Sequence, residues 1–400
     1  MDMKEVFIIS ATRTAIGKYG GTLRNTKSRD LASLVIKEAI KRATIEPDMV
    51  QEVIMGEVRQ STEAGNMARL ASLSAGVPEM VPAFTVNRLC ASAMQALNCG
   101  FQQIRLGEID VAVAGGSENM SQAAFYVRGG RFGDVQPYFV DSNVEAGPCS
   151  QPPEIYGVNL GMGQTAENVA EMYGINREDQ DIFSLQSQQR AAKAIKENKF
   201  AEEIVPVQVK GRKGVVEFAA DEFPRPETTM EDLSRLKPIF KKEGGTVTAG
   251  NACGRNDGAS AVVLMSGEKM DALRLKPLGR IVAVSTVGVS PKFMGIGPVS
   301  AVKAVLEKAK MRLGDIDLIE LNEAFAAQAL AVIRQLDMDA NITNVNGGAI
   351  ALGHPLGATG TRLIVSLLHE MARRKARYGL ATLCIGGGQG MATIVENLQR

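Results

Sequence analysis

Tryptophan is absent from this chain of 400 residues, and aromatic side chains make up only 5% of it. Net charge is almost as scarce, because 45 Lys and Arg stand against 44 Asp and Glu. A chain without a marked positive charge suits neither nucleic acid nor an anionic membrane surface, so we expect neither as a partner. Aliphatic side chains dominate the 45% hydrophobic content and, with 41 glycines, predict a globular core with close backbone contacts.

Long apolar runs and paired cysteines are also missing. The longest uncharged apolar stretch, residues 324–333, contains Gln328 and is far shorter than the roughly 20 residues that a membrane span needs. The five cysteines form no C-x-x-C pair, so neither a disulfide framework nor a zinc site is indicated. We therefore expect a cytoplasmic protein in a reducing compartment, with no metal and no membrane contact.

Strand-like and helix-like segments alternate in the same order at both ends of the chain, which predicts a duplicated α/β layered fold with parallel strand pairing. Two unrelated α/β domains with coincidental spacing are the alternative. The segments are 6–10, 30–42, 53–55, 91–104 and 111–114 in the first part, and 281–285, 300–310, 318–321, 361–372 and 380–385 in the second.

The middle of the chain differs from both ends, with many prolines and glycines and a polar helix near residues 178–198. Long insertions in compact α/β folds usually form lids or binding surfaces. We predict an N-terminal half made of residues 1–119 and 255–276, an inserted loop domain at 120–254, and a C-terminal half at 277–400.

Only two histidines are present, His354 and His369. His369 lies in an amphipathic helix pattern and is expected to be a solvated helix residue. His354 has glycines on both sides and is followed by Pro355, which disfavours a helical backbone at the histidine. Taken alone, His354 is better explained as a hydrogen-bonded turn residue than as a functional one.

Two cysteines stand where chemistry is feasible. Cys90 opens an amphipathic helix, where the helix dipole favours a thiolate, and Cys384 ends a strand that three glycines follow. Burial as a small apolar side chain is the alternative for each. If the two halves pair, both cysteines and His354 can meet at one pocket, a set that suits acyl transfer through a thioester. Cys90 and His354 alone would also suit a cysteine hydrolase.

Four segments resemble the signature segments of the thiolases. They are, in chain order, Asn87–Ser92, Asn322–Phe325, Gly353–Gly357 and Cys384–Gly388. The resemblance extends from Val6 to the C-terminus. It implies two similar βαβαβαββ halves packed as a five-layer αβαβα sandwich, with a loop domain inserted in the first half.

The resemblance also implies roles for the conspicuous residues. Cys90 would carry the acyl group, His354 would accept its proton, and Cys384 would exchange the proton at the α-carbon. His354 and a water on Asn322 would form one oxyanion hole, and the N–H groups of Cys90 and Gly386 the other. The implied reaction is the reversible Claisen condensation of two acetyl-CoA to acetoacetyl-CoA and CoA, with CoA thioesters as substrates and no cofactor.

Further positions match substrate-binding residues of that family, although an ordinary core position is the alternative for the apolar ones. They are Arg225 near the nucleotide, Ala249 and Phe240 at the pantetheine tunnel, and Met162, Met294 and Phe325 around the acyl group. Residues 128–130 match the loop with which the biosynthetic enzymes assemble, which implies a homo-oligomer, either a tetramer or a dimer.

Three departures from the acetoacetyl-CoA-forming members bear on specificity. Gly161 stands where many have a histidine, Cys253 replaces a usual serine, and the loop from residue 136 to residue 160 is longer. They keep open a broader-range degradative 3-ketoacyl-CoA thiolase of fatty-acid β-oxidation.

Two alternatives outside the thiolase activity are weaker. Residues 161–166 match G-x-G-x-x-A, but the poor strand before them disfavours a dinucleotide-dependent oxidoreductase. A non-catalytic binding protein is disfavoured because all four catalytic positions are present.

Overall fold

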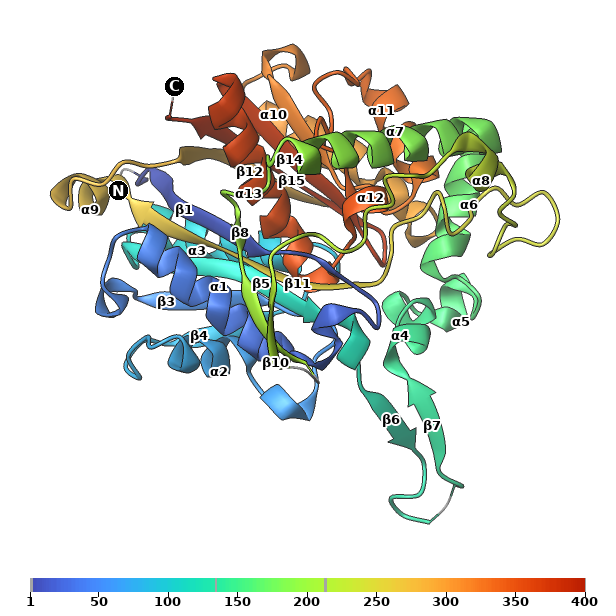
Figure 1. Ribbon diagram of the computed structural model, residues 1–400, viewed down its shortest axis with the longest axis horizontal. Coiled ribbons are helices and arrows are strands. Elements are labelled where there is room, and N and C mark those ends of the chain that lie inside the picture. Colours follow the sequence, from blue (N-terminus) through green and yellow to red (C-terminus); the bar gives the residue numbers. More distant parts are fainter. Residues whose placement is uncertain (1–2, 134, 212–213, 400) are drawn as a thin grey trace.

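The computed structural model describes residues 3–133, 135–211 and 214–399. Helices and strands alternate in five layers, αβαβα, with the first half of the chain on one side of the molecule and the second half on the other (Figure 1). The duplicated sandwich predicted from the sequence is thereby confirmed. The strands run β1-β11-β5-β3-β4 in one half and β12-β15-β14-β13 in the other.

The two sheets join at their edges, where Phe7 of β1 pairs with Arg280 of β12 and Ile8 pairs with Gly279. The N-terminal strands are β1 (Val6–Thr14), β3 (Glu52–Gly56), β4 (Ala83–Val86), β5 (Val111–Asn119) and β11 (Asn256–Ser266), with β2 (Gly17–Lys18) on β11 and β8 (Ile204–Val205) on β1. The C-terminal strands are β12 (Gly279–Gly288), β13 (Leu318–Leu321), β14 (Tyr378–Ile385) and β15 (Gln389–Asn397).

Helices form the other three layers. The central layer holds α3 (Ser92–Leu106) and α13 (Leu356–Arg374). The outer layers hold α1 (Ser28–Arg42) and α2 (Met67–Ser74) on the N-terminal sheet, and α10 (Gly297–Ala309) and α11 (Ala326–Leu336) on the C-terminal sheet. Three separate apolar cores fill the spaces between these layers. In β11, Val263 faces one core and Val262 the next, because both faces of the strand are buried.

Strand pairing is mixed, so the prediction of parallel pairing was wrong in part. β3 is parallel to β4 and β5, and β13 is parallel to β14, but β11 and β15 run antiparallel to their neighbours. The reason in the C-terminal half is a tight hairpin, since only residues 386–388 separate β14 from β15. Gly387 and Gly388 have φ values of +76° and +84°, which favour glycine.

The segment between β5 and β11 contains a hairpin that extends away from the sandwich (Figure 1) and several helices. Its elements are β6 (Phe125–Arg128), β7 (Tyr138–Asp141), α4 (Ser142–Glu145), α5 (Pro153–Tyr156), α6 (Met162–Tyr173), α7 (Arg177–Lys196), β9 (Val207–Gly211), β10 (Gly214–Phe218) and α8 (Met230–Ser234). The remaining α-helices are α9 (Gly267–Ala272) and α12 (Ala349–Leu352). Short 3-10 helices span 22–25, 47–49, 62–64, 120–122, 148–150, 291–296 and 313–315. No helix within the described ranges could cross a membrane.

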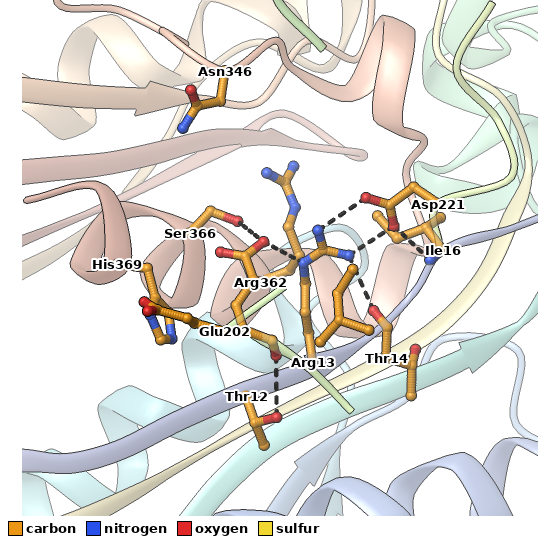
Figure 2. A network of polar contacts seen from close by, with 12 residues as sticks. Thr12, Arg13, Thr14, Ile16, Glu202, Asp221, Asn346, Arg362, Ser366 and His369 are labelled. Carbon is orange, nitrogen blue, oxygen red and sulfur yellow. Dashed lines mark hydrogen bonds and ion pairs between the residues drawn. The ribbon is translucent and has the colours of Figure 1, made fainter. Parts of the chain in front are cut away.

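A buried ionic network ties β1 to this segment (Figure 2). Arg13 is almost fully buried, and its guanidinium bonds to Glu203 at 2.6 Å and to both oxygens of Asp221 at 2.7 and 2.9 Å. His369 lies at the edge of the same network, with Nε2 3.4 Å from the carbonyl oxygen of Ala11. The expectation of a solvated His369 was wrong, because the N-terminal half covers this face of α13.

Candidate active site

Cys90 lies in a tight turn between β4 and α3. Leu89, immediately before it, has a φ of +48°, a conformation that is unfavourable for a leucine. Among the hydrogen bonds that hold this turn, the Leu89 N–H donates to Asn87 Oδ1 at 2.9 Å, and the Ser92 hydroxyl donates to the Leu89 carbonyl at 2.7 Å. The turn therefore fixes the position of the thiol two residues before α3 begins.

The sequence-based expectation of a thiolate at Cys90 was wrong. Burial raises the pKa of the Cys90 thiol and outweighs the hydrogen bond from the Gly386 backbone and the positive charge of Arg59, which lower it. The helix N-terminus alone does not compensate for the lost hydration. Cys90 therefore rests as a thiol and needs a base to become a nucleophile.

His354 is buried at the end of the turn that precedes α13. Its backbone N–H donates to Asn256 Oδ1 at 2.9 Å, and its Nδ1 lies 2.7 Å from Thr359 Oγ1. The Thr359 hydroxyl donates its single hydrogen to the Pro355 carbonyl at 2.8 Å, so its oxygen accepts a hydrogen bond from the Nδ1–H of His354. The imidazole consequently carries its hydrogen on Nδ1 and presents a basic Nε2.

Burial, and secondarily the charge of Arg362, lower the pKa of His354 to about 3. The imidazole is therefore neutral at physiological pH. A neutral imidazole with an open Nε2 can accept a proton from a neighbouring thiol.

Asn322 approaches the same nitrogen. Its Nδ2 lies 3.5 Å from His354 Nε2, and its Oδ1 is buried without a hydrogen-bond partner among the described residues. A buried amide oxygen without a partner is costly, which makes a bound water at this point favourable.

Cys384 is the second-last residue of β14 and is 1% exposed. Burial raises the pKa of its thiol well above the ordinary value, and the nearby Cys90 and Cys253 raise it further. Gly386 follows in the hairpin, where a Cβ would stand 3.2 Å from Leu89 and 3.3 Å from Met162. The absence of a side chain leaves the Gly386 N–H open to the Cys90 sulfur.

One pocket of about 700 Å³ gathers most of the predicted site. It is lined by Cys90, His354 and Cys384 and by four of the predicted substrate-binding residues, Met162, Phe240, Met294 and Phe325. The rings of Phe240 and Phe325 meet edge to face with centroids 6.4 Å apart. Asn322 and Gly386 contact residues that line this pocket: the Asn322 amide approaches His354, and the Gly386 backbone N–H donates a hydrogen bond to Cys90.

Arg225 and Ala249 line a second pocket, of about 310 Å³. Ala249 is only three residues from Ala252, which lines the first pocket, so the chain passes from one pocket to the other within this short segment. The Arg225 guanidinium lies over the ring of Phe223 at 5.4 Å.

Sequence reasoning missed three members of the site. Thr359 sets the His354 tautomer, and its position five residues after the histidine was a usable signal. Cys253, noted only as a departure, lines the first pocket, and burial raises the pKa of its thiol to about 12. Arg59 lines the pocket from a distant part of the chain, and no local pattern marks it. Within the described residues, no group of His, Cys, Asp and Glu side chains could hold a metal ion.

The chain is similar to known proteins along almost its whole length. A family model described as "Thiolase, N-terminal domain" matches residues 6–268, and "Thiolase, C-terminal domain" matches residues 275–397. The acetyl-CoA acetyltransferase of Pseudomonas aeruginosa is 50% identical over 393 residues, which cover 98% of each chain.

Two solved structures have the same fold. The acetyl-CoA acetyltransferase of Bacillus anthracis matches with a TM-score of 0.95 at 46% identity, over 99% of this chain and 100% of that one. Human mitochondrial 3-ketoacyl-CoA thiolase in complex with CoA matches with a TM-score of 0.92 at 44% identity, over 98% of each chain.

Proposed function

The chain belongs to the thiolase family, and from that premise we propose that it catalyses the reversible Claisen condensation of two acetyl-CoA to acetoacetyl-CoA and CoA. The observation that carries the proposal is the gathering of Cys90, His354 and Cys384 around one pocket. Relatives named acetyl-CoA acetyltransferase support the choice of the acetyl group over longer chains. The reaction requires no cofactor beyond the CoA thioesters themselves.

In the first half-reaction, Cys90 attacks the carbonyl carbon of acetyl-CoA while His354 Nε2 takes the thiol proton. The backbone N–H groups of Cys90 and Gly386 would stabilise the oxyanion. The carbon–sulfur bond to CoA then breaks, and Cys384 protonates the leaving thiolate. Acetyl-Cys90, a Cys384 thiolate and a protonated His354 remain.

In the second half-reaction, the Cys384 thiolate removes an α-proton from a second acetyl-CoA. Protonated His354 and a water on Asn322 would stabilise the enolate oxygen, for which the unpartnered Asn322 Oδ1 supports the water. The enolate carbon attacks acetyl-Cys90, acetoacetyl-CoA forms, and the released Cys90 thiolate recovers its proton from His354. Every proton moved in one half-reaction is thus returned in the other.

For the CoA arm, we propose a path from the Cys90 pocket to the Arg225 pocket. Phe240 and Ala249 would line the pantetheine, and Arg225 would lie near the nucleotide. Met162, Met294 and Phe325 would enclose the acyl group. This path for CoA is supported by the short segment from Ala249 to Ala252, whose two ends line the two pockets.

The test is CoA-dependent cleavage of acetoacetyl-CoA beside 3-oxooctanoyl-CoA, with the same purified protein and with a Cys90→Ala variant. We expect cleavage confined to the four-carbon substrate and turnover abolished in the variant, with its thermal stability retained. Wild-type protein that leaves acetoacetyl-CoA intact, or a variant with undiminished turnover, would refute the proposal. Comparable rates on both substrates would favour the broader-range degradative thiolase.

We also propose a homo-oligomer, a tetramer or a dimer, in the cytoplasm. The hairpin of β6 and β7 supports assembly, because Phe125, Phe132 and Phe139 are 68%, 87% and 80% exposed in the single chain. Light scattering of the purified protein measures the assembly directly. A reducing compartment is supported by the mechanism, which needs Cys90 and Cys384 as free thiols.

A further inference from the structure

The described residues that line the Cys90 pocket include two arginines and no carboxylate. Arg59 and Arg255 both line it, and neither forms an ion pair with a described residue. Arg255 is exposed, and its guanidinium lies over the ring of Tyr19 at 5.8 Å, so water solvates its charge. Arg59 is half-buried, and its unpaired charge is therefore the one that needs an explanation.

One side of the Arg59 guanidinium is held in place and the other is free. Nε donates to Asn143 Oδ1 at 3.1 Å, while Nη1 and Nη2 have no hydrogen-bond partner among the described residues. The acid that acts on this charge, Glu118, is already occupied, because its carboxylate accepts backbone N–H groups from Val58, Arg59 and Gly357. Two parallel N–H donors on a fixed guanidinium match a carboxylate.

Asn143 belongs to the loop of residues 136–160, which we expect from the sequence to be longer than in the acetoacetyl-CoA-forming enzymes. It is the second residue of α4, and its Nδ2 donates to the Met120 carbonyl at 2.8 Å, so both polar atoms of its side chain are held by hydrogen bonds. Residues 144, 147 and 148 of the same loop also line the pocket. Arg59 is near the nucleophile as well, because its charge lowers the pKa of the Cys90 thiol. The loop and Arg59 thus line part of the same pocket as Cys90, which we call the Arg59 end of the pocket.

We propose that this end of the pocket binds a carboxylate at the far end of the acyl chain, so that the enzyme also cleaves 3-oxoacyl-CoA substrates derived from dicarboxylic acids. The substrate class rests on the proposed thiolase activity. Arg59 is the residue that selects it, through Nη1 and Nη2, with Asn143 as the residue that positions the guanidinium.

The chemical step is the same cleavage with a different acyl group. His354 takes the proton of the Cys90 thiol as the sulfur attacks the C3 carbonyl of the substrate, the bond between C2 and C3 breaks, and Cys384 protonates the acetyl-CoA enolate that leaves. The ω-carboxyacyl group stays on Cys90 until free CoA displaces it. The Cys384 thiolate takes the thiol proton of that CoA, and His354 returns its proton to the released Cys90 thiolate. The carboxylate does not react and serves only for binding.

The test uses pairs of substrates. One member of each pair is the CoA monothioester of a 3-oxo dicarboxylic acid with five to eight carbons, and the other is the same compound with its free carboxylate converted to a methyl ester. Both members of a pair share the CoA group and the chain length, so the ratio of their kcat/KM values reports only the carboxylate. We expect wild type to prefer the carboxylate in at least one pair. Arg59→Leu should reduce that ratio by about 10- to 100-fold, the range of a charge-assisted hydrogen bond. Arg59→Lys should retain part of the preference.

Arg255→Leu is the matched control, since it removes the same charge from the same pocket at an exposed position. Its ratio should stay within about twofold of wild type, because an exposed charge is screened. A wild-type ratio at or below one at every length, or equal effects of the two leucine variants, would overturn the proposal.

A binding experiment separates this proposal from the thiolase activity. Calorimetry with the Cys90→Ala protein measures the Kd of glutaryl-CoA against that of its methyl ester, and no turnover is needed. If acetoacetyl-CoA is not cleaved but the carboxylate binds at least 10-fold more tightly in an Arg59-dependent way, only the proposed activity fails. Equal Kd values with normal cleavage of acetoacetyl-CoA overturn the carboxylate site alone.

Discussion

The hydrogen bond between His354 and Thr359 makes a quantitative prediction about catalysis. A Thr359→Val substitution keeps the shape of the side chain and removes the acceptor of the Nδ1 hydrogen. The imidazole must then either keep a buried Nδ1–H without a partner or move the hydrogen to Nε2, which removes the base that faces the pocket. Leaving a buried donor unsatisfied costs about 1–3 kcal/mol. At about 1.4 kcal/mol for each factor of ten, kcat/KM should fall about 5- to 150-fold.

Thr361→Val provides a matched control on the same helix. Thr361 is fully buried like Thr359, and its hydroxyl donates to the Ala93 carbonyl at 3.0 Å, but it has no hydrogen bond to His354. Each substitution removes one buried hydrogen bond to a carbonyl, which should lower the free energy of unfolding by about 1 kcal/mol, and Thr359→Val should lower it by about 1–3 kcal/mol more because the His354 Nδ1 hydrogen loses its acceptor. Only Thr359→Val should change catalysis.

The assay is steady-state cleavage of acetoacetyl-CoA across pH, with urea unfolding of the same preparations. We expect kcat/KM to fall in Thr359→Val and to stay within about twofold of wild type in Thr361→Val, since the Thr361 hydroxyl bonds to the Ala93 carbonyl and not to His354. If the two variants have the same kcat/KM and the same pH profile, Thr359 does not set the imidazole tautomer.

Two further predictions follow from the burial of charged and nucleophilic groups. Because burial raises the pKa of the Cys90 thiol, the rate of its alkylation by iodoacetamide should still increase above pH ~8.5, the ordinary thiol pKa. Mass spectrometry of each cysteine measures this rate, with the exposed Cys149 as the internal reference. A rate for Cys90 that levels off below pH ~8.5 would contradict the prediction. Arg13→Leu leaves Glu203 and Asp221 buried without their cation and should lower the free energy of unfolding by about 3–5 kcal/mol. Arg312→Leu removes an exposed ion pair and is the control: it should change the free energy of unfolding, measured in urea, by less than about 1 kcal/mol. If both variants lose the same free energy of unfolding, the buried ion pairs of Arg13 are not the reason for its effect.

The layers were predictable because each rests on a local pattern. Apolar strand runs and helices with one apolar face marked the approximate positions of the segments predicted at both ends of the chain, whereas the inner strands β11 and β15 were not among those segments. Gly115 and Gly116 show where this approach fails. They lie inside β5 instead of ending it, because a Cβ would stand 2.1 Å from the Ser260 carbonyl oxygen or 1.9 Å from that of Gly357. These close backbone contacts are tertiary contacts between segments far apart in the chain, so local sequence patterns cannot predict them.

The candidate site was predictable where residues adjoin a signature segment and unpredictable where they meet across the fold. Cys90, His354 and Cys384 each stand in a segment with its own glycine or helix signal. Arg59 is fixed by Asn143, 84 positions away in the chain, and neither residue belongs to a motif. Position along the sequence therefore indicates the proposed reacting groups better than it indicates Arg59, the residue proposed to select the substrate.

The resting state of the nucleophile depends on two pKa shifts that act in the same direction. Burial raises the pKa of the Cys90 thiol and lowers that of His354 to about 3, so both shifts disfavour a thiolate–imidazolium pair. A helix N-terminus beside the cysteine had suggested the opposite, because local sequence shows the dipole but not the desolvation of the whole pocket. In the proposed mechanism, the proton would therefore move from Cys90 to His354 when a bound thioester provides a developing oxyanion near the Gly386 N–H. Substrate then supplies the charge that stabilises the protonated imidazole, and the unliganded thiol stays unreactive toward other electrophiles.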